Sequence, residues 1–478
     1  MTSHSEPHST DHVLFQSMIE ALTGGEREIA FHGDGDLPSA FAITDLAAAA
    51  FGAAGTALAD FCDLHTYDIS PWRAIKSLFM PSQRHRRLDV SVDRRLASFW
   101  FGWSIHPHGW EMPSLWDPIA GVYEATDGWI WLHTNAPHHR DAALRVLGCD
   151  NDRESVAAAV KTWEMTELES AIVAEHGCAA AILSLDAWAA HPQGQAVASE
   201  PLIAKEWHQP QDPRQWSFDP ERPLADFKVL DLTRVLAGPI AGRFLAAYGA
   251  KVLRIDPPWW SEPGVVPEMT LGKRCAGLDL SKDDGREVFR TLISECDVML
   301  HGYRADALER LGFGAEERRA INPNVIDVSL NAYGWTGPWR DRRGFDSLVQ
   351  MSSGIADQGM AWAGADKPTP LPVQALDHAT GHLLAAAAIG GLSSRLLTGD
   401  VMTLRLSLAR TAHLLTSQGR VASGDALKAE TADDLDPTIE QTDWGPAQRL
   451  RWPLAIQDCP ARWDRPATDL RSAPPEWP

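Results

Sequence analysis

The feature that most constrains this fold is a pair of short apolar runs joined by a segment long enough for one helix. Residues 229–239 read VLDLTRVLAGP, and residues 248–256 read YGAKVLRID. The first run suits a buried parallel strand, and proline after Gly238 is tolerated in the first turn of a helix. The second run predicts the next strand. Together they predict half of a nucleotide-binding βαβ unit, without the Gly-x-Gly-x-x-Gly turn that dinucleotides require.

Composition and charge narrow the possible partners. A chain of 478 residues with 44% hydrophobic and 22% charged residues is typical of a soluble protein with two or three domains. Its formal net charge of −21 argues against nucleic acid and against an anionic membrane surface. Residues 226–345, however, contain 17 Lys/Arg and 17 Asp/Glu, so this segment has no net charge. A polyanion can therefore bind there without facing a repulsive field.

Cysteine usage and the terminus indicate the compartment. The six cysteines have no CxxC spacing, which predicts neither a disulfide framework nor a zinc site. The first dozen residues are polar, which does not predict a signal sequence. The longest apolar run, near residues 383–392, is interrupted by Gly390 and Gly391 and is too short to span a bilayer. We therefore expect a cytoplasmic protein with no membrane segment.

The first half of the chain predicts mixed α and β structure. An Ala-rich helix is expected at 45–59 and a strand or helix entry at 88–92. Residues 121–132 predict a β-hairpin that turns at Asp127 and Gly128. Further helices are predicted around 138–147, 153–176 and 184–191. The Pro-rich stretch 209–225 then reads as a linker between an N-terminal half, 1–208, and the rest.

Several motifs follow the first βαβ unit in a fixed order. They are GKRCAGLDL at 272–280, DVML at 297–300, YRADALERLG at 303–312, INPNVIDVSL at 321–330, YGWTGP at 333–338 and GFD at 344–346. In this order they resemble the class III CoA-transferases, the family of formyl-CoA transferase, carnitine CoA-transferase and α-methylacyl-CoA racemase. The resemblance covers residues 226–415.

The resemblance implies a fold and a domain plan. An α/β domain at 226–419 would hold a Rossmann-like parallel sheet with helices on both faces, and it would bind CoA and carry out catalysis. A smaller α+β domain, at about 113–208, would come from the N-terminal half. Residues 420–478 would form an acidic loop, mobile up to residue 445, and a Pro/Trp-rich tail.

The two halves also resemble each other. Residues 45–52 are similar to 377–384, and residues 88–94 are similar to 404–410. The first half lacks a nucleotide-binding part, and the second lacks a small domain. This predicts a fused duplication in which each copy has lost what the other keeps. The alternative is that Ala-rich helices look alike by chance.

Asp377 is the candidate catalytic residue. Taken alone, an aspartate at the start of a helix is a common cap. The resemblance implies more, because Asp377, Thr380 and Gly381 match the family pattern around its nucleophilic aspartate. Asp377 would then attack an acyl-CoA, form a mixed anhydride and next an aspartyl-CoA thioester, and pass the CoA to an acceptor acid.

A metal site beside Asp377 is not expected. His378 and His382 share one face of the predicted helix, but no third ligand is visible nearby in the sequence. Packing and hydrogen bonding are the preferred roles for both side chains.

The resemblance also implies a set of CoA contacts. They are Val235, Leu236, Ala237, Lys273, Arg274, Tyr303 and Arg310. Each basic residue alone reads as a solvated surface charge, whereas together they predict a phosphate cradle. Gly302 stands where many family members carry asparagine, and the glycine loop that shields the aspartate has no clear counterpart here.

Three functions follow as hypotheses. The first is an acyl-CoA:carboxylate CoA-transferase, with CoA as a substrate, no permanently bound cofactor, and a homodimer that covers a Trp-rich surface of the first half. The second is an α-methylacyl-CoA racemase or isomerase, although Phe345 stands where racemases carry an acid/base histidine. The third is a non-catalytic CoA-binding protein. The 20 tryptophans suggest walls for a bulky acid, but core packing is the preferred reading.

Overall fold

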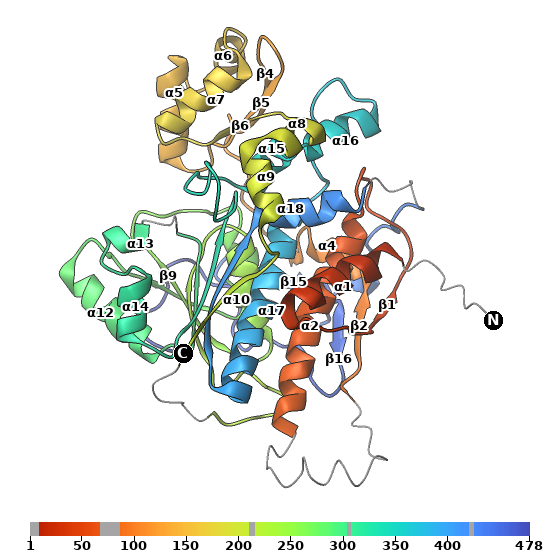
Figure 1. Ribbon diagram of the computed structural model, residues 1–478, viewed down its shortest axis with the longest axis vertical. Coiled ribbons are helices and arrows are strands. Elements are labelled where there is room, and N and C mark those ends of the chain that lie inside the picture. The colour runs from red at the N-terminus through yellow and green to blue at the C-terminus, as the bar shows by residue number, and fades with distance from the viewer. Residues whose placement is uncertain (1–8, 67–86, 210–215, 304–306, 420–424) are drawn as a thin grey trace.

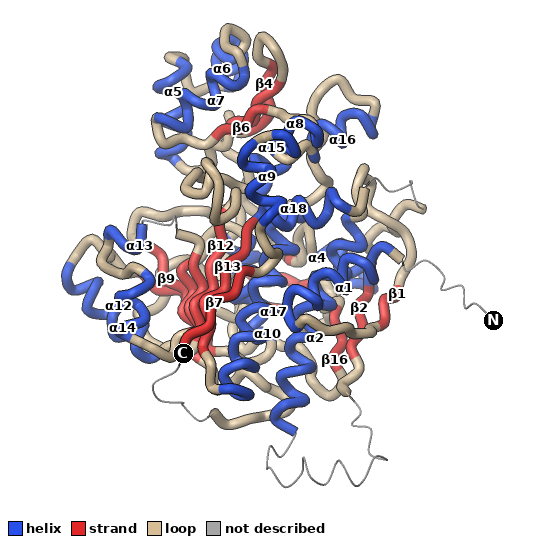
Figure 2. Tube along the Cα trace, viewed as in Figure 1, coloured by secondary structure: helices blue, strands red, loops and turns tan. Residues whose placement is uncertain are grey.

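A mostly parallel β-sheet forms the centre of the molecule (Figures 1 and 2). The computed structural model describes residues 9–66, 87–209, 216–303, 307–419 and 425–478. Within them the largest sheet has seven strands in the order β10-β9-β8-β11-β12-β13-β7, all parallel except β7. The strands are β7 (Ala204–His208), β8 (Lys228–Leu232), β9 (Lys251–Asp256), β10 (Arg274–Gly277), β11 (Val298–His301), β12 (Ile326–Asn331) and β13 (Val401–Ser407).

Helices cover both faces of this sheet, as predicted. Alternate residues along a strand point to opposite faces, so Val229 and Leu230 of β8 enter two different apolar clusters. Val229 packs toward α10 (Ala237–Ala247) and α17 (Ala375–Thr398). Leu230 packs toward α12 (Asp283–Glu295). The predicted α/β fold class is confirmed. Smaller helices on these loops are α11 (Val266–Met269), α13 (Ala307–Arg310), α14 (Ala315–Ile321), α15 (Asp346–Ser352) and α16 (Ile355–Ala363).

The first half repeats one βαβ unit of the second. In the second half, β12, α17, β13 and α18 (Leu408–Ser417) come in this order along the chain, with α15 and α16 inserted between β12 and α17, and β12 and β13 are parallel. In the first half, β1 (Ala30–His32), α2 (Ile43–Thr66), β2 (Val90–Asp93) and α4 (Arg94–Trp100) do the same. Both long helices have 24 residues, and they pack along each other (Figure 1). This shared order fits the predicted duplication.

Helix α2 is long and apolar enough to cross a membrane by composition alone. In the structure it is a core helix instead, with 94% of its apolar window buried. It lies between α17 and α1 (Thr10–Thr23), which explains why so many of its positions are small alanines.

The small domain stands apart at one end of the molecule (Figure 1). It contains the hairpin of β4 (Gly121–Glu124) and β5 (Trp129–Leu132), then α5 (Pro137–Leu147), α6 (Arg153–Val160), α7 (Met165–Ala174) and β6 (Ala179–Ala181). The single helix predicted at 153–176 is wrong. It is interrupted after Lys161, and α7 begins where Met165 donates its N–H to Asp127 of the hairpin turn at 2.8 Å. Helices α8 (Leu185–Ala190) and α9 (Pro192–Ser199) lead back to the main body.

Residues 425–478 are built into the body rather than forming a separate tail. The strand β15 (Gly445–Arg449) pairs with β3 (Ile105–Pro107) and with β14 (Glu440–Thr442), and β16 (Leu454–Ile456) pairs with β2. The expected mobile loop also has fixed contacts where it is described. Asp434, the last residue of the short helix η1 (Ala432–Asp434), accepts hydrogen bonds from Arg95 at 2.6 and 2.8 Å.

The boundary near residue 208 is less sharp than predicted. Strand β7 belongs to the N-terminal half in sequence, yet it completes the edge of the main sheet by pairing with β13. The linker predicted at 209–225 lies partly outside the described residues.

Candidate active site

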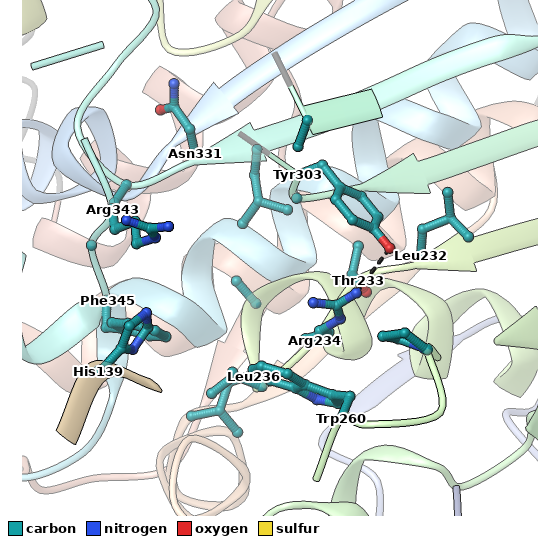
Figure 3. Close-up of a pocket in the computed structure, with 18 of the residues that line it drawn as sticks. His139, Leu232, Thr233, Arg234, Leu236, Trp260, Tyr303, Asn331, Arg343 and Phe345 are labelled. Atoms are coloured by element: carbon teal, nitrogen blue, oxygen red, sulfur yellow. Dashed lines mark hydrogen bonds between the residues drawn. The ribbon is translucent and has the colours of Figure 1, made fainter. Parts of the chain in front are cut away.

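A cavity of about 590 Å³ opens at the carboxyl edge of the parallel strands (Figure 3). The chain leaves β8 for β9 on one side and later returns to β11 on the other, so β8 and β11 flank the switch point of the sheet. Leu232 and Tyr303, at or just after the ends of these two strands, line the cavity. Ligands of open α/β sheets bind at such a crevice.

Asp377 lines this cavity from the first turn of α17. Its side chain is 8% exposed. Its backbone N–H donates to Oδ2 of Asp346 at 2.9 Å, which ties the start of α17 to the start of α15. The candidate nucleophile is thus an aspartate inside a cavity rather than an aspartate that caps a helix at the surface.

Asp346 and Asp377 form a buried acidic pair. Burial raises the pKa of Asp346 to about 6, although the Asp377 N–H and the Gln350 amide stabilise its charge. Burial, and then repulsion by Asp346, raise the pKa of Asp377 well above its usual range. Since Asp346 receives the hydrogen bonds, it is the residue of the pair that ionises first.

The turn after β8 brings backbone to the cavity wall. Val235, Leu236 and Ala237, which the sequence predicts as CoA contacts, all line the cavity. Val235 has a φ of 64°, which is strained for a β-branched residue, and its N–H donates to Glu262 at 2.9 Å. Strain held by a specific contact is common at binding sites.

Gly381 explains how α17 approaches this turn. A Cβ at Gly381 would lie 2.4 Å from the carbonyl oxygen of Ala237 and 2.7 Å from Cβ of Ile240. Only glycine allows α10 and α17 to pack this closely, and this packing places Asp377 beside the turn. Thr380 is buried, and its hydroxyl lies 2.7 Å from that of Thr411.

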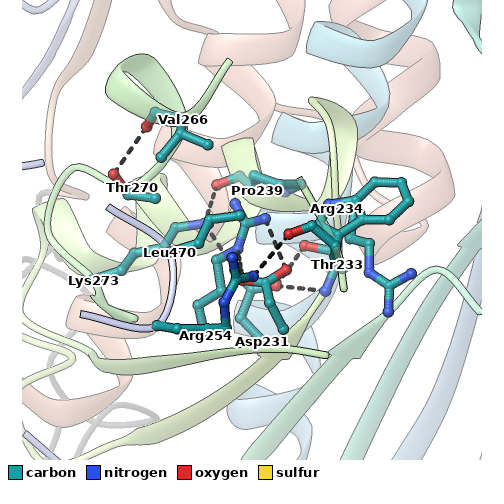
Figure 4. Close-up of polar contacts among 12 residues, drawn as sticks. Asp231, Thr233, Arg234, Pro239, Arg254, Val266, Thr270, Lys273 and Leu470 are labelled. Atoms are coloured by element: carbon teal, nitrogen blue, oxygen red, sulfur yellow. Dashed lines mark hydrogen bonds and ion pairs between the residues drawn. The ribbon is translucent and has the colours of Figure 1, made fainter. Parts of the chain in front are cut away.

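Lys273 and Arg274 do not line the cavity. Lys273 is buried, with Nζ 2.8 Å from Oδ2 of Asp231 and 2.8 Å from the carbonyl oxygen of Pro239 (Figure 4). It therefore holds the β8–α10 turn from behind, which corrects the expected contact with phosphate. Arg274 donates instead to the carbonyl oxygen of Pro474 at 3.2 Å.

Arg310 lies at the border of the cavity. It ends α13, and its side chain is exposed, whereas Ala307 and Leu311 on either side of it line the cavity.

Sequence reasoning missed Arg234. Its guanidinium lies 4.6 Å from the ring centre of Trp260, 5.0 Å from that of Tyr303 and 5.6 Å from that of Trp259 (Figure 3). It also donates to the Tyr303 hydroxyl at 2.8 Å. Its Nε is buried without a hydrogen-bond partner among the described residues. We call this group, Arg234, Trp259, Trp260 and Tyr303, the aromatic shelf.

The small domain adds histidines that were also missed. His138 and His139, from the first turn of α5, line the cavity together with Phe345. The ring of Phe345 stacks on His133 with centroids 3.7 Å apart. Burial lowers the pKa of His133 to about 3, so this imidazole is neutral.

His378 and His382 are packed among aromatic rings. Phe101 lies 5.1 Å from His378, and Phe51 lies 4.0 Å from His382, between ring centres. Burial is the main cause that lowers the pKa of both. No group of three potential metal ligands occurs among the described residues.

Asp45 occupies the matching position in the repeat. Like Asp377, it is the third residue of its 24-residue helix. Its carboxylate, however, pairs with Arg94, which also contacts Asp11 at 3.2 Å and Asp36 at 3.3 Å. The corresponding Arg410 donates to the carbonyl oxygen of Glu200 instead, at 2.7 Å.

Comparison with known proteins confirms the resemblance. Residues 224–437 match the model of CoA-transferase family III. A probable fatty acyl-CoA transferase of Mycobacterium tuberculosis, Rv3272, is 35% identical over 191 residues, which are 37% of this chain and 48% of that protein. The succinyl-CoA–D-citramalate CoA-transferase of Chloroflexus aurantiacus is 30% identical over 251 residues, which are 46% of this chain and 60% of that protein.

A solved structure also matches. The crystal structure of Rv3272 is 31% identical, with a TM-score of 0.38, and the match covers 42% of this chain and 57% of that one. The chain thus spans about half the length of the curated relatives that it matches.

Proposed function

We propose that this chain moves CoA between carboxylic acids through an aspartyl-CoA thioester. Its residues 224–437 match the model of CoA-transferase family III. The observation that carries the proposal is the position of Asp377. Its side chain lines the same cavity as the β8–α10 turn and the aromatic shelf, at the switch point of a parallel sheet. Named relatives that transfer CoA support the reaction class.

In the proposed reaction, a carboxylate oxygen of Asp377 attacks the thioester carbonyl of an acyl-CoA. The C–S bond breaks and the CoA thiolate leaves, so a mixed anhydride remains on Asp377. The thiolate then attacks the aspartyl carbonyl, the anhydride C–O bond breaks, and the first acid departs. The acceptor carboxylate repeats these two steps in reverse order. It ends as acyl-CoA, and Asp377 is again a carboxylate.

The acidic pair favours this covalent route. Asp377 is buried beside Asp346, and both effects raise its pKa because they penalise its charge. Acylation removes that charge, so the same two effects stabilise the anhydride and the thioester relative to the free carboxylate. The carboxylate that does form is a stronger nucleophile than a solvated one.

The aromatic shelf is the proposed contact for the nucleotide end of CoA. Tryptophan and tyrosine faces stack on a base, and the guanidinium of Arg234 carries the positive charge that a phosphate needs. Arg310 at the rim is the second proposed phosphate contact. Both lie in the segment that has no net charge.

Intact-mass analysis after incubation with acyl-CoA tests the function. The native chain is expected to gain the mass of CoA, and peptide mapping is expected to place it on Asp377. The variant Asp377→Asn should form no adduct, whereas Asp45→Asn should form as much as the native chain. Absence of any adduct across a panel of acyl-CoAs would favour a non-catalytic CoA-binding protein.

One observation favours proton transfer as a second candidate. His139 lines the cavity with Asp377, beside the Phe345 that replaces the racemase histidine. Two acid/base groups in one cavity suit removal and return of a proton at the carbon next to a thioester. Exchange of that hydrogen for deuterium in 2-methylacyl-CoA, without any CoA adduct, would establish this candidate instead.

A further inference from the structure

We propose that the part of the cavity beside α5 is a second anion site, in which Arg343 selects short dicarboxylic acids as acyl groups and acceptors. The inference rests on the proposed transfer at Asp377. One carboxyl group of each acid must react at Asp377. A guanidinium farther along the same cavity therefore has a second carboxylate as its natural partner.

The cavity walls fall into two groups. Figure 3 shows Arg234, Tyr303 and Trp260 on one side, and Arg343, His139 and Phe345 on the other. The first group follows strands β8, β9 and β11, and it is assigned to CoA above. The second group comes from α5 and from the loop that joins β12 to α15, and we call it the acid arm.

The residues on both sides of Arg343 are fixed in place. Arg342 donates to Glu169 and to the carbonyl oxygen of Ala179, both at 2.7 Å, which anchors it to the small domain. Gly344 has no room for a side chain, since a Cβ there would lie 2.5 Å from Cβ of Ala332.

The next residue, Phe345, stacks on the buried His133. Arg343 itself donates to the carbonyl oxygen of His176 at 3.0 Å while lining the cavity. The guanidinium is thus presented by a preorganised segment, as selective binding of a charged group requires.

Arg343 is connected to the nucleophile by a short stretch of chain. It lies three residues before Asp346, so their Cα atoms are at most about 11 Å apart, and both Arg343 and Asp377 line the cavity. Asp346 in turn accepts the N–H of Asp377 at 2.9 Å. The ring of Phe345 belongs to the segment between the two ends, and it provides an apolar surface for the methylene groups of the acid.

The charges of the acid arm also suit an anion. His138, which lines the arm, has a pKa lowered first by burial and then by Arg343 and Arg234. The positive charges of Arg343 and Arg234 therefore both act on the part of the cavity at His138. Asp341, an acid of the same loop, is 62% exposed and pairs with Arg340.

A phosphate of CoA is the competing partner for Arg343, and kinetics separate the two. We would compare transfer from succinyl-CoA to glutarate with transfer from butanoyl-CoA to pentanoate, in the native protein and in Arg343→Met. The variant is expected to lose about 10- to 100-fold in kcat/KM for the diacid pair. The monoacid pair should change by less than about threefold. Arg145→Met, on α5 and not among the residues that line the cavity, is the matched control because its side chain is 58% exposed, and it should leave both pairs unchanged.

Equal losses for both pairs would assign Arg343 to CoA and overturn the inference, as would a native preference for the monoacids. Binding gives a readout that does not need turnover. Calorimetry should detect glutarate binding to the CoA-loaded Asp377→Asn protein and not to the Asp377→Asn, Arg343→Met double variant. No glutarate binding to the first would reject the acid arm, whereas absence of a CoA adduct in the native chain would reject the transfer chemistry alone.

Discussion

Two aspartates from different helices share one buried space, and their separate roles follow from their hydrogen bonds. Asp346 accepts the N–H of Asp377 and an amide proton of Gln350, so its charge is stabilised. Asp377 has burial and the neighbouring charge acting against its ionisation. The pair thus keeps the carboxyl group of Asp346 charged and favours the neutral form of Asp377.

This arrangement predicts how the pH dependence of adduct formation responds to Asp346. In the native protein the rate of CoA adduct formation should rise with pH as Asp377 loses its proton. Asp346→Asn removes the negative neighbour, so the midpoint of the rise should move to lower pH. Quenched-flow mass spectrometry across pH 4–9 measures it.

Asp283→Asn is the matched control, because its side chain is 96% exposed and it does not line the cavity, and it should leave the midpoint in place. A midpoint that stays fixed or moves upward in Asp346→Asn would mean that the two carboxyl groups do not interact.

The raised pKa of Asp377 also makes the stability of the fold depend on pH. The pKa of Asp377 is raised on folding, so the folded chain holds a proton that the unfolded chain releases above about pH 4. The contribution of Asp377 to stability is therefore full at low pH and is lost as pH rises through its folded pKa. Asp377→Asn cannot ionise, so it should avoid this loss of stability and raise the free energy of unfolding at pH 8 by about 1 kcal/mol. The same variant should lose about 10³-fold or more of the activity.

Urea unfolding at pH 8 and at pH 5 measures this effect. The gain should be smaller at pH 5, where the native carboxyl holds its proton. A variant that is less stable than the native protein at both values would contradict the raised pKa.

The residues of the site were only partly predictable from the sequence. Asp377, Tyr303 and the 235–237 turn lie inside local motifs, so their neighbours in sequence identify them. Lys273 lies in such a motif too, but its partner Asp231 is 42 residues away, and that contact turns it from the cavity. His139 and Arg343 line one cavity although they are more than 200 residues apart in sequence, and no local pattern predicts such an arrangement.

At the scale of elements, the position of Asp377 depends on how closely α10 and α17 approach. Gly381→Ala would place a methyl group 2.4 Å from the carbonyl oxygen of Ala237, and backbone cannot yield as a flexible side chain does. We expect a loss of about 1–3 kcal/mol in the free energy of unfolding and a slower rate of adduct formation, because α17 must shift.

Gly390→Ala is the matched control on the same helix, since its added Cβ meets nothing within 4 Å. It should be neutral or slightly stabilising because alanine favours helix. Similar effects from both substitutions would mean that the close approach of α10 and α17 does not depend on Gly381.

Element types followed from periodicity, whereas their boundaries and partners did not. The hairpin at 121–132 was correct because its Asp127-Gly128 turn is a local signal. The break between α6 and α7 was not predicted because residues 153–176 have apolar residues at helical spacing throughout. The start of α7 is instead marked by a hydrogen bond from Met165 to the distant Asp127. The pairing of β16 with β2 joins residues more than 350 positions apart, and periodicity cannot show this.

At the scale of the whole molecule, the two halves act as partners within one chain. Helix α2 packs on α17, and the first half supplies the small domain to the cavity of the second.

The homodimer stays a prediction, although the Trp-rich surface that it was expected to cover is small. Among the described residues of the first half, Trp207 is the one tryptophan that is exposed. Light scattering at micromolar concentration tests it, and a monomer would contradict it.

A buried acid ties three distant parts of the chain together. Glu268 has no exposed side-chain surface and pairs with Arg243 and, at 2.8 Å, with Arg449. It also accepts from the Ser104 hydroxyl at 2.6 Å and from the Ile105 N–H at 3.1 Å. The first half, the domain of the seven-stranded sheet and the C-terminal segment therefore meet at one carboxylate.

Glu268→Gln would leave the buried guanidinium of Arg243 without its charge partner and would leave Arg449 with Glu440 as its remaining carboxylate, and we expect it to lower the free energy of unfolding by about 3–5 kcal/mol. Because Arg449 lies on β15, the C-terminal segment should also become sensitive to protease before the rest unfolds. The matched control is Glu175→Gln, whose partner Arg145 and own side chain are both more than half exposed, and it should cost less than about 1 kcal/mol. Urea unfolding and timed proteolysis measure both variants. Equal stabilities, or a protease-resistant C-terminal segment in Glu268→Gln, would mean that the segment is held by its strand pairing alone.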